Sequence, residues 1–272
     1  MSYRFVFSIS ASTLFLLAAP LEAQPALPLA PIPPGGEMVS PFFEGWYANP
    51  DGTYTLSFGY LNRNMNEAVE IPLGEGNFIR PAQFDGKQPT YFTPTRERGV
   101  FGIVVPPDFQ GDVVWTLVRN GTTHFVPGRI TSPAYEMSHK PMAAGSTPPA
   151  VRFDSEGEPG RGPAGTTSGP LTTSVGVPLT LHVRSVDDRS VRDSDVPLNV
   201  SWYKFQGPGA VSFSEDVGET GPGGGEVSTE ATFAAPGAYL VRVRVDNFAA
   251  SDSNHQDQCC WTNGYLQVDV TP

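Results

Sequence analysis

The chain has 272 residues, of which 17 are lysine or arginine and 28 are aspartate or glutamate, so its formal charge at pH 7 is −11. This acidic balance argues against a nucleic-acid-binding protein, which needs basic patches to neutralise phosphate, and against docking on anionic lipid. Glycine (29 residues) and proline (28 residues) favour many turns over long helices, and the hydrophobic share of 39% is enough to build a buried core.

Residues 1–23 have the features of a secretory signal peptide. Arg4 supplies the positive start, an apolar stretch follows it, and Ala23 provides a small residue at the expected cleavage point. The apolar stretch is too short for a good membrane span, and no later stretch approaches the ~18 continuous apolar residues of one. We therefore expect a secreted or periplasmic protein in an oxidising compartment, without a membrane span after cleavage. An uncleaved N-terminal anchor is the alternative.

A proline-rich stretch, residues 24–40, predicts an extended spacer. Residues 41–135 then alternate short aromatic or β-branched runs with turn signals, which predicts an antiparallel β domain. The apolar pattern of its runs has a period of two, and Asp51-Gly52 is typical of a tight hairpin turn. The strands expected in this domain are 53–61, 100–105, 113–118 and 123–127.

Residues 136–169 lose this alternation, and their proline and glycine predict a linker or long loop between two domains. Short strands return at 170–272, and about seven strands in about 100 residues indicate a β-sandwich. In the run 238–247, apolar residues from Tyr239 onward are expected to face the core, whereas Arg242 and Arg244 are expected to face out. The other strands expected here are 178–185, 198–205, 210–213, 226–233 and 266–270.

The second unit resembles the immunoglobulin-like domains of the polycystin (PKD) type that occur in secreted bacterial proteins. The resemblance covers residues 171–271 and is carried by Trp202, by Gly207-Pro208-Gly209-Ala210-Val211-Ser212-Phe213, and by the segment 231–240 with Pro236-Gly237 and Tyr239. It implies a sandwich in which Trp202 fills the core and Tyr239 lies close to the position of a tyrosine corner. The chain lacks the WDFGDG-type segment of typical PKD members and carries an acidic insert at 246–263, so the resemblance extends to the broad class.

The first unit resembles an uncharacterised module of exported bacterial proteins. The matching residues are Glu44-Gly45-Trp46-Tyr47, Asn49-Pro50-Asp51-Gly52, Phe58-Gly59-Tyr60, Asn62-Arg63-Asn64, Gln88-Pro89-Thr90 and Val114-Trp115-Thr116-Leu117. A shorter match, FEGWY at 43–47, is similar to lipocalin-like cyclases that bind isoprenoid lipids. The expected fold is therefore all-β, with two antiparallel β domains after a signal peptide, the second an immunoglobulin-like sandwich of the PKD type.

Aromatic and polar side chains lie close together in the first β domain. Aromatic rings stack on sugar rings, and amides and guanidinium groups bind sugar hydroxyls, so this composition is typical of a carbohydrate-binding face. The alternative interpretation makes the aromatic residues part of the core and the arginine a structural donor. The candidate ligand-binding residues are Trp46, Tyr47, Tyr60, Asn62, Arg63 and Asn64.

Cys259 and Cys260 are the only two cysteines, and they are adjacent. In an exported chain they predict a vicinal disulfide, although neighbouring Cα atoms lie ~3.8 Å apart, closer than the ~4.4–6.8 Å of most disulfides. Two buried thiols or intermolecular bonds are the alternatives. A redox function is not expected, because the C-x-x-C spacing is absent.

Aspartates gather in two segments between the strands of the second domain. Ca²⁺ takes six to eight oxygen ligands, often from adjacent loops, so these segments are candidates for a structural calcium site. Solvated, charged turns are the competing interpretation, and no other cofactor is expected. The candidate ligands are Asp187, Asp188, Asp246, Asp252 and Asp257.

The sequence has no G-x-S-x-G, H-E-x-x-H or P-loop motif, and its four histidines are scattered. Glu44 with Glu67 or Glu70 is the one carboxylate pair to consider for glycoside hydrolysis. We predict an exported, non-catalytic binding or adhesion protein, with no catalytic residues. Its first domain would recognise a glycan or a protein partner, and its second would be a spacer or interaction unit. The alternatives are a lipocalin-like or hydrolytic enzyme acting on a lipid or sugar, and a structural subunit of an envelope or extracellular assembly.

Overall fold

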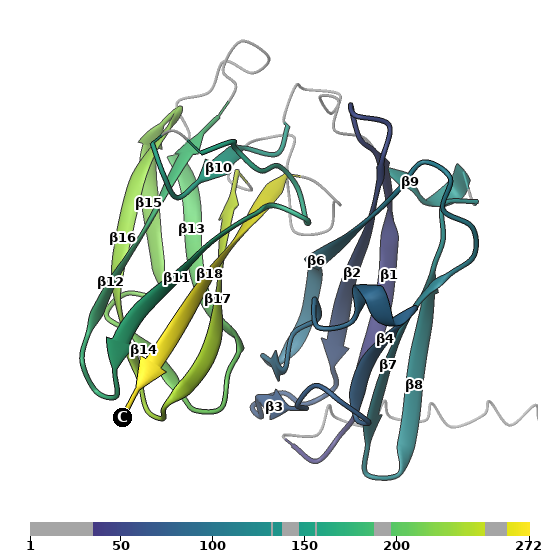
Figure 1. Cartoon of the computed structure of the whole chain (residues 1–272), viewed down its shortest axis with the longest axis horizontal. Helices are drawn as coiled ribbons and strands as arrows, with labels where there is room; N and C mark the ends of the chain where they lie inside the picture. Colours follow the sequence, from purple (N-terminus) through teal and green to yellow (C-terminus); the bar gives the residue numbers. More distant parts are fainter. Residues whose placement is uncertain (1–34, 132, 138–146, 156, 188–196, 248–259) are drawn as a thin grey trace, which may run out of the picture. The chain divides into compact units, whose positions relative to one another are not determined.

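The computed structural model describes residues 35–131, 133–137, 147–155, 157–187, 197–247 and 260–272. Their regular elements are strands, apart from two short 3-10 helices, η1 (Ala82–Phe84) and η2 (Pro133–Tyr135). The chain is therefore all-β, as the sequence predicts (Figure 1). Among these residues, no helix has the length and apolar character that a membrane crossing requires. The predicted signal peptide, 1–23, lies outside the described residues.

The first set of strands forms two main sheets and a small one. One sheet has the order β6-β2-β1-β9, another has the order β4-β7-β8, and β3 pairs with β5. All of these pairs are antiparallel except the short pair of β1 and β9. The strands are β1 (Val39–Ala48), β2 (Tyr54–Asn62), β3 (Val69–Glu70), β4 (Asn77–Arg80), β5 (Tyr91–Phe92), β6 (Thr95–Val105), β7 (Val113–Arg119), β8 (Thr122–Gly128) and β9 (Glu136–Met137).

Aromatic rings dominate the core of these sheets. Phe58 stacks on Phe101 with ring centroids 5.3 Å apart, and Trp115 meets Phe101 edge-on at 5.0 Å. The turn that joins β1 to β2 is the predicted hairpin: the amide of Asn49 donates to the carbonyl of Thr53, and Gly52 adopts φ +87°. The period-two pattern of β2 thus places its large apolar residues on the core side.

The second set of strands forms two sheets packed as an immunoglobulin-like sandwich (Figure 1). One has the order β10-β12-β16-β14, and the other has the order β11-β18-β17-β13-β15. Neighbours are antiparallel except β11 and β18, which run parallel. The strands are β10 (Ala150–Arg152), β11 (Thr166–Ser174), β12 (Leu179–Val186), β13 (Pro197–Gln206), β14 (Val211–Phe213), β15 (Val217–Pro222), β16 (Gly224–Phe233), β17 (Gly237–Asp246) and β18 (Trp261–Thr271).

Trp202 and Tyr239 occupy the places that the resemblance implies. Trp202 is buried in the sandwich core, and the Tyr239 hydroxyl donates to the carbonyl of Ala235 at 2.8 Å, which is the hydrogen bond of a tyrosine corner. Gly207 packs against the ring of Tyr239, with φ +137° and no room for a Cβ atom. The Gly-Pro-Gly segment of the motif therefore packs directly against this tyrosine.

The range 136–169 is more regular than the sequence indicates. It contains β9 and β10, and β11 begins in it at Thr166. Residues Ile32–Pro272 form one compact unit, and the aromatic cluster of the first sheets includes Phe205 and Tyr265 from the second set. The division of the chain into two domains, 41–135 and 170–272, remains a prediction.

Replacing Tyr239 by phenylalanine removes the hydrogen bond to Ala235 and keeps the ring. We expect the free energy of unfolding to fall by about 1 kcal/mol, because one partly buried carbonyl loses its donor. Chemical denaturation measures this loss, with Tyr135→Phe, at a half-exposed tyrosine, as the control. Equal stabilities of the two variants would contradict this role of Tyr239.

Candidate functional site

The outer face of the β17–β18 sheet is buried around Arg242 and Arg244. In β17, Val241, Val243 and Val245 face the sandwich core, as predicted. Arg242 and Arg244 lie on the opposite face, but only 2% and 9% of their surfaces are exposed. They face away from the sandwich core, as predicted, but they do not reach solvent, because β6 and the residues after its bulge cover this face.

Successive side chains of β6, the strand that covers this face, contact β1 on one side and β17 on the other. Arg96 donates to the carboxylate of Glu44 on β1 at 2.6 Å, and Arg98 lies 3.6 Å from the same carboxylate. Glu97, between them, points to the other side, where its carboxylate lies 3.6 Å from Arg242 and 3.7 Å from Arg244. Since successive side chains of a strand point to opposite faces, the segment Arg-Glu-Arg joins two sheets at once.

The buried arginines are held by ring faces as well as by charge. The guanidinium of Arg242 lies 4.9 Å from the ring centre of Tyr203 and donates from Nε to Asn263 at 3.0 Å. The guanidinium of Arg244 lies 4.7 Å from the ring of Trp261. Burial lowers the pKa of Arg244, and Glu97 opposes that effect. A planar, weakly hydrated guanidinium suits such a site better than an ammonium group does.

A bulge at Gly99 brings β18 into contact with β6. The register of β2 and β6 shifts here, and Gly99 adopts φ +50°. Its carbonyl accepts hydrogen bonds from the indole of Trp261 at 3.2 Å and from the amide of Asn263 at 2.8 Å. A Cβ atom at Gly99 would lie 2.2 Å from the Trp261 ring, so glycine is required for space as well as for conformation.

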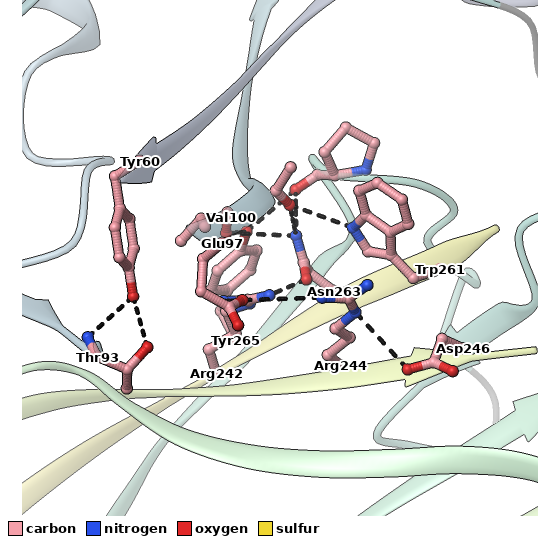
Figure 2. Close-up of polar contacts among 12 residues, drawn as sticks. Tyr60, Thr93, Glu97, Val100, Arg242, Arg244, Asp246, Trp261, Asn263 and Tyr265 are labelled. Atoms are coloured by element: carbon pink, nitrogen blue, oxygen red, sulfur yellow. Dashed lines mark hydrogen bonds and ion pairs between the residues drawn. The ribbon is translucent and has the colours of Figure 1, made fainter. Parts of the chain in front are cut away.

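Tyr265 completes this junction. Its hydroxyl donates to the carbonyls of Val100 and Pro163, each at 3.0 Å. Burial raises the pKa of Tyr265 above its ordinary value, so the phenol remains a donor into the alkaline range as well as at neutral pH. We call the contacts of Glu97, Gly99 and Val100 with Arg242, Arg244, Trp261, Asn263 and Tyr265 the polar junction (Figure 2).

A groove of about 770 Å³ begins where the polar junction ends. One wall is β6 from Phe101 to Val104, with Phe84 and Lys87 near it, and the other wall is the outer face of β17 and β18. Beyond Tyr265 that face is open, and Gln267 and Asp269 are exposed. The groove therefore combines apolar side chains with a few amide and charged groups, which is the composition of a binding site.

The predicted carbohydrate-binding residues do not form an exposed face. Trp46, Tyr47 and Tyr60 are buried, because the strands that carry them have neighbours on both faces. Asn62 and Asn64 are buried as well: Asn62 donates to the carbonyls of Glu67 and Phe92, and Asn64 donates to that of Glu37. Arg63 is the exposed member of the set. The interpretation of these aromatic residues as core residues is the one that the burial supports.

The three glutamates considered for hydrolysis each have a different cationic partner. Glu44 binds Arg96, Glu67 binds Arg119 at 2.8 Å, and Glu70 binds the ammonium of Lys204 at 2.5 Å. The backbone amide of Gly36, with Arg119, lowers the pKa of Glu67. Each of these carboxylates is thus engaged in an ion pair, and Glu44 also lies 3.6 Å from Arg98.

The predicted disulfide and calcium site fall partly on residues outside the described ones. Cys260 is buried and is not a free thiol, but Cys259 lies outside, so the vicinal disulfide stays a prediction. Asp187 and Asp246 are buried, and Asp246 accepts from Asn199 at 3.4 Å. Within the described ranges no group of three or more histidine, cysteine, aspartate or glutamate side chains is arranged to hold a metal. The calcium site stays a prediction, since Asp188, Asp252 and Asp257 lie outside those ranges.

No family model and no curated protein matches the chain. Domains 4 and 5 of the S-layer protein SbsC align with 15% identity over 62% of this chain and 69% of that one, with a TM-score of 0.27. The D00-D0 domain of intimin aligns with 11% identity over 86% and 100%, with a TM-score of 0.29. PapD-like domain 7 of human CEP192 aligns with 12% identity over 48% and 92%, with a TM-score of 0.30.

Replacing Glu97 by glutamine leaves Arg242 and Arg244 buried without their shared anion. We expect the free energy of unfolding to fall by about 3 kcal/mol, because Arg242 becomes a buried charge that has lost its ion-pair partner, whereas Arg244 keeps Asp246 at 3.7 Å. Glu226→Gln is the matched control, since Glu226 pairs with Arg184 at 2.6 Å and both side chains are about half exposed; its loss should stay below about 1 kcal/mol. Equal losses in urea titrations would contradict the importance of burial at Glu97.

Replacing Gly99 by alanine places a methyl group against the Trp261 ring. We expect a loss about 2 kcal/mol larger than that of Gly121→Ala. Gly121 is the matched control because it also has a positive φ, +75°, but has open space around its Cα atom. Thermal unfolding of both variants separates backbone strain from crowding, and equal losses would mean that crowding at Trp261 does not matter.

Proposed function

We propose that the protein is an exported, non-catalytic binding protein and that its ligand lies in the groove beside the polar junction. The main observation in support concerns the two walls of the groove, which are β6 and the outer face of β17 and β18. At one end of the groove, buried hydrogen bonds and charge contacts join these walls. Walls fixed in this way form the groove before a ligand arrives, which lowers the entropic cost of binding.

The lining supports a binding function. Phe84, Val104 and Leu240 supply apolar surface, and Gln267 and Lys87 supply polar groups at the exposed rim. Sites for small molecules and peptide segments combine these two features, with volumes of roughly 300–1,000 Å³. The ligand would be a glycan or a protein partner at the cell surface or outside, in keeping with the signal peptide expected at 1–23. Both sets of sheets line the groove, so the ligand would be recognised by residues of both sets and not by residues 41–135 alone.

The test compares the mature chain, residues 24–272, with a variant whose groove is filled. Gln267→Trp places a large ring in the groove from an exposed position on β18. Thr180→Trp, at an exposed position on β12 in the other sheet of the sandwich, is the matched control. Each protein is applied to a glycan array and to a phage-displayed library of 12-residue peptides.

We expect saturable binding by the unaltered chain and by Thr180→Trp, with at least a tenfold weaker affinity in Gln267→Trp. This difference follows from steric exclusion, and fluorescence titration with the selected ligand measures it. Absence of saturable binding to either library, or equal affinities of the three proteins, would overturn the proposed function.

A further inference from the structure

Among the residues that the structure describes, one edge of β6 has no strand beside it. The sheet order is β6-β2-β1-β9, so β6 is an end strand that pairs with β2 on one side only. Within the described ranges, the other edge is contacted by side chains of β18 at Gly99 and Val100 and then enters the groove at Phe101–Val104, where the backbone of Ala164 lies close to Gly102. An edge of this kind presents backbone donors and acceptors to whatever lies beside it.

The direction of these backbone groups follows from the Tyr265 contact. The carbonyl of Val100 points away from β2, because it accepts from the hydroxyl of Tyr265. Backbone groups alternate along an extended strand, so those of every second residue point to the same side. The N–H and C=O groups of Gly102 and Val104 therefore point into the groove, whereas those of Phe101 and Ile103 point to β2.

The composition of this edge suits pairing with another strand. Residues 100–105 read VFGIVV, which is uncharged and rich in β-branched residues, and 48% of Val104 is exposed. Open edges are usually protected by lysine, proline or a bulge, since an uncharged edge of high β-propensity is a template for other chains. Here the bulge precedes the free stretch, and Pro106-Pro107 follows it. The intervening edge is thus left competent for pairing.

These observations lead us to infer that the groove binds an extended polypeptide segment of a partner protein, which adds a strand to the edge of β6 at Gly102 and Val104. The inference rests on the proposed function and names its ligand class. Main-chain hydrogen bonds would supply affinity, and alternate side chains of the segment would contact Leu240 and Ala238 or Gln267 and Asp269 on the facing wall.

The aromatic residues of the groove favour a peptide over a glycan. Phe101, Tyr239 and Tyr265 are buried, and the ring of Phe84 is half-buried and meets Phe109 edge-on. Sugar rings stack on exposed aromatic faces, which these residues do not provide. An unpaired strand edge, in contrast, is specific for another extended backbone.

Hydrogen exchange of the free mature chain tests the edge itself. We expect the amides of Gly102 and Val104 to exchange at least tenfold faster than those of Phe101 and Ile103, because the latter donate to β2. A peptide selected from the library should then slow the exchange of Gly102 and Val104. Protection of these two amides in the free protein, or unchanged exchange with saturating peptide, would overturn the inference.

Two substitutions at one position test the backbone contact. Val104→Pro removes the N–H that points into the groove and leaves the bonds to β2 in place, whereas Val104→Thr keeps that N–H. We expect the affinity for the selected peptide to fall about tenfold in Val104→Pro and to change less than twofold in Val104→Thr. The same loss in both variants would show that the side chain matters and the backbone does not.

A modified peptide provides a measurement that leaves the protein unaltered. Methylation of alternate backbone nitrogens of the peptide should weaken binding at least tenfold for the set that faces β6 and much less for the other set. Equal effects of both sets would overturn strand addition. If a glycan binds, and Gln267→Trp abolishes that binding while Val104→Pro leaves it unchanged, strand addition is overturned and the proposed function is upheld. If neither library yields a ligand, both proposals are overturned.

Discussion

Two arginines buried on the outer face of a sandwich sheet set the main constraint on this molecule. Removing a guanidinium from water is costly, and the cost is offset only where an anion and further contacts replace the lost hydration. Glu97 is the anion shared by Arg242 and Arg244, and the rings of Tyr203 and Trp261 lie against the guanidinium groups. β6 must therefore lie over β17 and β18, and the groove exists because that contact ends at Tyr265.

The same charges specify the register of β6. A shift of β6 by one residue would turn every side chain to the opposite face. Arg96 and Arg98 would then face Arg242 and Arg244, and Glu97 would face Glu44. Both contacts would bring like charges together, so the alternation of charge along three residues excludes the neighbouring registers. The bulge at Gly99 fixes the register further, because it is the point at which Trp261 and Asn263 reach the backbone of β6.

The sequence was informative where a pattern depends on neighbours along the chain. The strands of the sandwich, the core position of Trp202 and the hydrogen bond of Tyr239 follow from period-two alternation and from the W…GPG…PGxY motif. The polar junction was not predictable in this way, since alternation separates two faces of a strand but does not say what covers each face. The aromatic residues at 46–60 were misleading for the same reason. One signal was available: β17 alternates valine with arginine, and β18 begins with Trp-Thr-Asn-Gly-Tyr, a composition that suits a sheet covered on both sides.

The parallel pairing of β11 with β18 has a mechanical consequence. Thr166 lies beside Gly264 and Ser174 lies beside Thr271, so the two strands run side by side in the same direction. A pull applied between Thr166 and Thr271 acts on opposite ends of this pair and slides one strand along the other. Every backbone hydrogen bond between them is then strained at the same moment, whereas a pull that peels strands apart breaks such bonds one after another. The sandwich is therefore built to resist tension along its strands more strongly than tension across them.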